Sequence, residues 1–282
     1  MRFCDYHPLV NITWFIAVGT VTMLYMNPVT TVITLLFACL MLRRLGGSRF
    51  GATLVPMMLA ALIINPLFSH EGATILAYFP SGNPLTLESI IYGIAAALML
   101  GCALILCLAF SRIVTTDKLH YLIGRVLPSL ALTLSMILRF VPRFVNHLKD
   151  AYNARIGICG IPQKKRDKVK HAAKAVSGTL TWALENSLNT ADSMKSRGWG
   201  LTHSTSFTPY RLTERDKDAL AAIIIMAIYF LSGIVYGSLE FRFYPTVKIA
   251  DVTPFGISCV IVYAFLCAYP LIMEVQYGSA KN

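Results

Sequence analysis

The chain has 282 residues, of which 56% are hydrophobic and only 14% are charged, and its formal net charge is +11. Soluble domains carry about 25% charged residues, so this composition argues against an ordinary soluble domain. The positive charge is concentrated, because residues 111–217 hold 18 Lys/Arg and 7 Asp/Glu while the rest of the chain has 7 of each. A basic cytoplasmic face is ordinary for a membrane protein, and this segment contains none of the usual nucleic-acid reader motifs. We therefore expect a protein of the lipid bilayer with no nucleic-acid partner.

Six apolar runs are expected to cross the membrane, since about 20 apolar residues span its hydrocarbon core. In chain order they cover residues 9–26, 29–42, 52–68, 87–110, 219–236 and 254–273. The second and third are short or interrupted by proline, so five spans are the alternative. Residues 69–89 contain no Lys or Arg and alternate β-prone pieces with Gly and Pro, which predicts a hairpin-like loop outside the cell. With the basic segments inside, both termini are cytoplasmic.

One face of the fourth run carries small residues four positions apart. They are Gly93, Ala97 and Gly101. Small side chains at this spacing allow another helix to approach closely. We expect a packing contact here and assign it no function.

The first half of the basic segment predicts an amphipathic helix. Residues 128–138 are apolar but too few to span the membrane, so we expect a re-entrant or interfacial helix. From the end of this stretch onwards, apolar residues recur at steps of four, three and four, which places them on one face of a helix. They are Ile137, Val141, Phe144 and Leu148. The helix is expected to end around Gly157, Gly160 and Pro162.

The second half predicts another amphipathic helix, over about residues 176–197. Before it, residues 163–174 hold six Lys/Arg and one Asp, which fits either contact with anionic headgroups or a solvated linker. The stripe of the helix is formed by Leu180, Leu184 and Leu188, and Gly198 supplies a left-handed cap. Both helices are too polar to span and too apolar to stand alone in water, so their stripes require each other, the bilayer or a protein partner.

Four stretches in this order resemble the transmembrane T component of energy-coupling factor (ECF) transporters, which are modular ABC importers of vitamins and metal ions. The stretches are Asn65–Leu76, Leu134–Phe144, Asn153–Gly160 and Trp182–Gly200. The resemblance implies an all-α polytopic helix bundle of about six spans with a central cytoplasmic domain of long coupling helices. We expect a membrane region over residues 1–110, the coupling domain over 111–217 and a second membrane region over 218–282.

The resemblance also implies the partners. Two cytoplasmic ATPases would bind the ATP and Mg²⁺, a membrane-embedded S component would bind the substrate, and this chain would bind no cofactor and catalyse nothing. The apolar stripes of both coupling helices would form the platform for the S component. Neither the substrate nor whether the module serves one S component or several follows from this chain.

In this family, each of two coupling helices ends in an arginine motif that enters an ATPase groove. Ser196, Arg197 and Gly198 match the second motif. The first motif departs from the pattern. Counted without gaps from the Leu138–Pro142 element, the position of the family's arginine is occupied here by Ile158. Either Arg155, followed by Gly157, takes the role from a shifted position, or this contact is made without an arginine.

A stand-alone secondary transporter and an intramembrane enzyme are the alternatives. The first four runs contain no charged residue except Glu88 at an edge, whereas ion-coupled carriers keep ionisable groups at membrane depth. His70-Glu71 lacks the second histidine of an H-E-x-x-H zinc site, since residue 74 is Thr. The chain also has no phosphate-binding G-x-x-x-x-G-K-[ST] loop.

Overall fold

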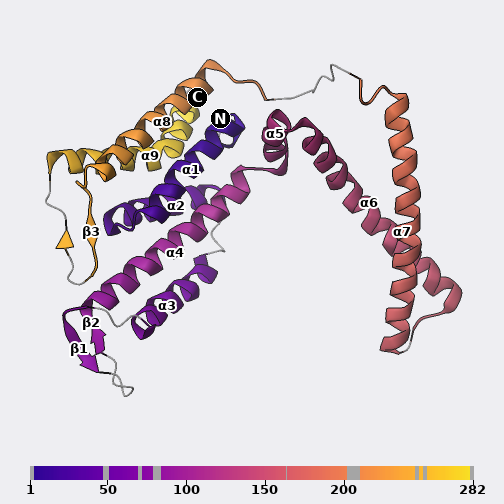
Figure 1. Cartoon of the computed structure of the whole chain (residues 1–282), viewed down its shortest axis with the longest axis horizontal. Helices are drawn as coiled ribbons and strands as arrows, with labels where there is room; N and C mark the ends of the chain where they lie inside the picture. The colour runs from indigo at the N-terminus through magenta and orange to yellow at the C-terminus, as the bar shows by residue number, and fades with distance from the viewer. Residues whose placement is uncertain are drawn as a thin grey trace. The chain divides into compact units, whose positions relative to one another are not determined.

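The computed structural model of the chain is almost entirely helical where it is described (Figure 1). It describes residues 3–46, 51–68, 72–78, 84–162, 164–201, 210–244, 248–249 and 253–279. The predicted all-α fold class is confirmed. The chain divides into two compact units, which we call the membrane unit (Met1–Leu119 with Tyr210–Asn282) and the central unit (His120–Pro209).

In the membrane unit, each of the six apolar runs is a helix. These are α1 (Pro8–Leu24), α2 (Pro28–Arg44), α3 (Gly51–Phe68), α4 (Leu87–Ile113), α8 (Glu214–Val235) and α9 (Pro254–Ser279), preceded by the short 3₁₀ helix η1 (Phe3–Asp5). Proline opens α1, α2 and α9, where its missing N–H costs no helical hydrogen bond. The backbone N–H of Phe3 donates to Glu274 at 3.3 Å, so η1 lies beside the last turns of α9.

The predicted count of six spans is only roughly matched. Among the described helices, four are long and apolar enough to cross a membrane: α4, α6 (Pro128–Cys159), α8 and residues 254–274 of α9. The helices α1 and α3 are apolar but shorter. Helix α6 qualifies through its apolar first half, which the sequence analysis assigns to a separate interfacial helix; the structure instead continues one helix through Pro142.

The membrane unit is held by a large aromatic core and a few buried polar contacts. Trp14 and Phe230 are buried in it, and the Trp14 indole donates to the Leu266 carbonyl at 2.7 Å. The Tyr263 and Thr34 hydroxyls lie 2.7 Å apart between α9 and α2. Inside a bilayer such groups need partners from other helices, so these bonds fix the register of the bundle.

Helix α3 packs against the small-residue face of α4, as predicted. A side chain at Gly93 would lie 3.3 Å from the Leu62 carbonyl, and one at Gly101 would lie 2.8 Å from the Met58 sulfur. Larger residues would therefore require the Met58 side chain to move and the backbone of α3 near Leu62 to shift slightly.

Two antiparallel hairpins complete the membrane unit. The predicted hairpin-like loop contains β1 (Ile75–Tyr78) and β2 (Pro84–Thr86). The second, β3 (Phe241–Arg242) with β4 (Lys248–Ile249), was not predicted. The rings of Tyr92 and Phe243 meet edge to face at 5.4 Å, so α4 contacts the chain beside the second hairpin.

The central unit consists mainly of two 32-residue helices, α6 and α7 (Lys165–Ser196). They follow α5 (Thr116–Val126), whose first residues still belong to the membrane unit. Figure 1 shows α6 and α7 crossing, and the two helices are in contact. Helix α7 begins about eleven residues before the predicted start, so the basic stretch from Lys165 onwards is helix. The linker interpretation of this stretch is therefore wrong.

Candidate functional site

The crossing of α6 and α7 is centred on Trp182. The His147 imidazole stacks on its indole with ring centroids 3.9 Å apart, and the Phe140 ring lies at 6.0 Å. The Arg143 guanidinium carbon lies 5.5 Å from the indole centroid, a distance at which a cation is attracted to the aromatic face. Sequence reasoning missed these four residues, because three of the four are polar or amphipathic and do not belong to an apolar stripe.

The contact face of α6 is offset from its apolar stripe. Residues 140, 143 and 147 face α7, whereas Ile137 and Val141 remain half exposed. On α7, exposure rises along the predicted stripe, from Leu180 to Leu184 and Leu188. Phe144 and Leu148 are partly buried. The two helices thus do not cover each other's stripes.

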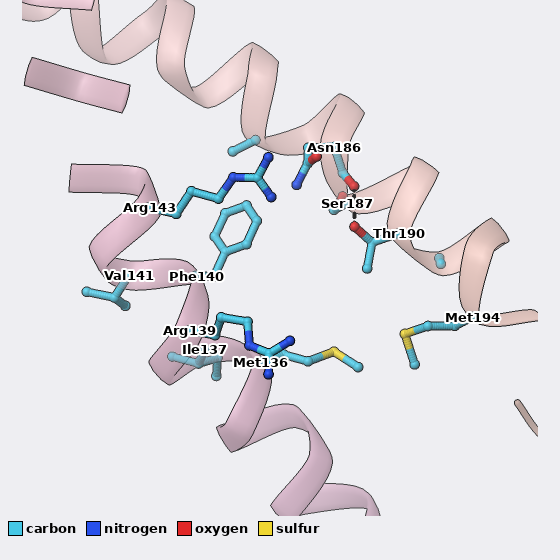
Figure 2. A pocket seen from close by; sticks show the side chains of 12 residues that line it. Met136, Ile137, Arg139, Phe140, Val141, Arg143, Asn186, Ser187, Thr190 and Met194 are labelled. Carbon is cyan, nitrogen blue, oxygen red and sulfur yellow. Dashed lines mark hydrogen bonds between the residues drawn. The ribbon is translucent and has the colours of Figure 1, made fainter. Parts of the chain in front are cut away.

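A pocket of about 680 Å³ opens between α6 and α7 (Figure 2). Figure 2 shows Met136 and Met194 reaching toward each other from the two helices. Arg139 and Arg143 come from α6, and the amide of Asn186 from α7. The other residues that line it are Ile137, Phe140, Val141, Ala183, Ser187, Thr190 and Ala191. The stripe of α6 therefore continues into a largely apolar hollow with flexible methionine walls, a surface that adapts to a bulky apolar partner.

The predicted second coupling motif forms the C-terminal cap of α7. Arg197 is the cap residue and is exposed. Gly198 has φ +83°, its N–H donates to the Lys195 carbonyl at 3.0 Å, and the Trp199 N–H donates to the Met194 carbonyl at 3.0 Å. This pair of bonds is the Schellman arrangement, which needs a left-handed residue at the position of Gly198. The guanidinium therefore projects from a helix end of defined geometry.

The predicted first coupling motif lies in the last turns of α6. Arg155 is partly buried, and its Nε atom is buried without a hydrogen-bond partner among the described residues. Gly157 is helical with open space around it, and Ile158 is 86% exposed. The helix ends at Cys159, where Gly160 turns the chain with φ +79°. The half-buried arginine and the exposed isoleucine therefore lie on the same last turns of the helix.

No described residues gather into a group of three His, Cys, Asp or Glu that could hold a metal ion.

Comparison with known proteins gives one family. The sequence model described as CbiQ, cobalt transport protein, matches residues 5–207. The match covers α1 to α7 and both predicted coupling motifs. No curated protein matches the chain.

Proposed function

Since the chain belongs to the CbiQ family of cobalt transport proteins, the T-component family of ECF transporters, we propose that it couples ATP hydrolysis by two partner ATPases to movement of a substrate-binding S component. It is a multi-pass membrane protein and a transport component that works with other subunits. The proposed cargo is a micronutrient, either a vitamin or a metal ion such as the cobalt of the family description, selected by the S component. The termini are proposed to be cytoplasmic.

The observation that carries this proposal is the division of surfaces on the crossed helices. Their mutual contact uses Trp182 and its polar neighbours, so the apolar stripes and the pocket stay free for a membrane partner. The helix ends carry Arg155 and Arg197, one on each helix. One pair of helices therefore offers an apolar platform and two separate cationic ends, which is what a coupler between a membrane subunit and two ATPases requires.

Rigidity makes the helix pair suitable as a lever. A 32-residue helix is about 48 Å long at 1.5 Å per residue, and the aromatic crossing fixes α6 to α7 near their middle. Closure of the two ATPases would displace the two cationic ends and thereby change the angle between the helices. The platform would follow that change, so the S component would be moved without any chemistry in this chain.

The proposal is tested by reversing the charge of Arg197 in the assembled transporter. Arginine offers a fixed fork of donors for an acidic groove, and truncating one partner of a buried charge pair at an interface costs ~2–5 kcal/mol. We expect Arg197→Glu to lose ATPase subunits on co-purification and to abolish uptake in vesicles, with Arg197→Lys intermediate. Radioactive cobalt is the first cargo to measure.

Lys195→Glu is the matched control, because Lys195 is exposed on the same turn and the substitution makes the same change in net charge. It should retain the ATPases. Normal retention and uptake in Arg197→Glu would refute the proposed role of Arg197, whereas equal losses in both variants would indicate a general effect of charge.

A further inference from the structure

A buried ionisable side chain of the membrane unit lies close in sequence to each connection between the two units. The chain enters the central unit after Leu119 and returns at Tyr210. Lys118 lies immediately before the first crossing and is 5% exposed, and Asp216 follows the second crossing and is 6% exposed. Lysine and aspartate are rarely buried unless they are paired, so the partners of these two side chains are informative.

Lys118 is held by the N-terminal segment of the chain. Its ammonium donates to the Cys4 carbonyl at 2.5 Å. It also donates to the side-chain oxygen of Asn11 at 2.6 Å, when the amide is oriented so that its nitrogen donates to the Phe3 carbonyl at 3.1 Å. Asn11 is fully buried. The start of α5 is therefore bonded both to η1, through Cys4, and to the first turn of α1, through Asn11.

Burial lowers the pKa of Lys118 below its ordinary value, and the nearby Cys4 and Asp5 side chains oppose this only in part. The ammonium is therefore kept in this site against a desolvation cost. A methionine of similar length would fill the space without that cost, but it would leave the Cys4 carbonyl and the Asn11 side chain without their donor, and each buried group that stays unpaired is destabilising. The lysine is thus the donor that joins the start of α5 to the N-terminal segment.

Asp216 is held by the same segment. One carboxylate oxygen accepts from the His7 backbone N–H at 3.3 Å. The other accepts from the Thr213 N–H at 3.0 Å and the Thr213 hydroxyl at 2.6 Å, closing the capping box of α8. One side chain therefore both starts α8 and joins it to residue 7.

The N-terminal segment is itself fixed to the bundle. Phe3 is 1% exposed, and its ring meets Trp14 edge to face at 5.8 Å. The Tyr6 hydroxyl donates to the Met273 sulfur at 2.9 Å, next to Glu274, which accepts from the Phe3 N–H. The segment is thus attached to α1 and α9 while it holds α5 and α8.

We infer that residues 3–11 form an N-terminal anchor that ties together both connections of the central unit, through Lys118 on the way out and Asp216 on the way back. In a coupling subunit, a force on the crossed helices would reach the membrane unit through both connections. The anchor would distribute that force over the whole helix bundle instead of leaving it on two independent loops. The role in coupling rests on the proposed function, but the physical tie does not.

Hydrogen–deuterium exchange on the full-length chain in nanodiscs tests the tie. Lys118→Met should lower the thermal stability modestly, because two acceptors at this buried site lose their donor. It should raise amide exchange at residues 214–217, on the other connection, about tenfold, since local opening sets exchange. Asp216→Ala should raise exchange at residues 117–119 in the same way. Thr34→Val is the control, because it removes a buried hydrogen bond between α2 and α9, outside the anchor, and should change neither connection.

The tie is refuted if each variant loosens only its own connection, or if Thr34→Val loosens both equally.

The role of the anchor in coupling is measured in the assembled transporter. Lys118→Met should keep the ATPases and their hydrolysis rate, while cargo moved per ATP falls about threefold or more, within the range by which residues outside both sites alter coupling. An unchanged ratio with ATPases bound overturns that role. If no ATPase joins even the unaltered chain, the proposed function fails, and the exchange result still decides the tie.

Discussion

His147 lies parallel to Trp182, with the two ring planes 9° apart and their centroids separated by 3.9 Å. This contact joins the middle of α6 to the middle of α7. Arg143 approaches the same indole from the same helix as His147. The rigidity of the helix pair therefore depends on one half-buried tryptophan and on the imidazole and guanidinium groups that lie against it, rather than on a thick apolar core.

Trp182→Ala should separate the two long helices. It removes two stacked ring contacts, with His147 and Phe140, and one cation–π contact with Arg143, together worth ~1.5–4 kcal/mol at a partly exposed site. We expect faster amide exchange along the crossing in both α6 and α7, while the membrane unit is unchanged. Trp182→Phe keeps a ring for His147 and should be intermediate. Trp199→Ala, at an exposed helix end, is the control; equal loosening in that variant would contradict the central role of Trp182.

The sequence predicted the helices of the membrane unit well because apolar runs and Asn-Pro or Gly boundaries are local signals. The left-handed cap at Gly198 followed in the same way from the glycine after Arg197. The helical start of α7 was missed because six cations in twelve residues resemble a solvated linker, although Lys and Arg are good helix formers.

The face by which α6 meets α7 could not be predicted from the apolar pattern. Periodicity finds the most hydrophobic stripe of each helix, but it does not say whether the two stripes cover each other. The structure joins the helices through Phe140, Arg143 and His147 on α6. A cation–aromatic contact requires the partner's position, which no single helix pattern contains. The N-terminal anchor was missed for the same reason, since its bonds join residues more than 100 positions apart.

Val141→Asp should detach the S component without detaching the ATPases. Val141 is 53% exposed on the stripe and lines the pocket, so the chain alone tolerates a charge there. In a complex, the same charge would be buried against an apolar partner at a cost of several kcal/mol. Co-purification of all subunits measures the result. The control is Asn146→Asp, which introduces an aspartate at an exposed position of the same helix outside the apolar stripe and should have no effect. Unchanged assembly in Val141→Asp would show that the stripe is not part of the interface.

Gly198→Ala should weaken ATPase binding through geometry alone. A left-handed conformation costs an L-residue about 1–2 kcal/mol, and the added methyl group would lie 3.2 Å from the Leu201 side chain. The cap is expected to unwind and the direction of Arg197 to become variable. Gly178→Ala is the matched control, because Gly178 lies inside the same helix, α7, and outside both coupling motifs, and no atom lies within 4 Å of the added methyl group, so it should be neutral or slightly stabilising. Retention of ATPases in both variants would show that the direction of the arginine is unimportant.

Arg155→Ala should reduce ATPase retention, but less than Arg197→Ala. Its buried Nε has no partner in the described chain, and an unpaired buried donor is costly, so an acceptor from a partner would satisfy it. The side chain is nevertheless partly buried against its own unit, which leaves less of it for an interface than the exposed Arg197 offers. Lys149→Ala, exposed two turns earlier on α6, is the control for loss of one positive charge.

Ile158→Asp tests the alternative in which the first contact is made without an arginine. If Ile158→Asp releases an ATPase while Arg155→Ala retains it fully, the contact is apolar and centred on residue 158, and Arg155 has no part in it. Ile158→Arg then completes the comparison, because it restores an arginine at the position of the family motif and should strengthen retention only if the ATPase groove at this end is acidic.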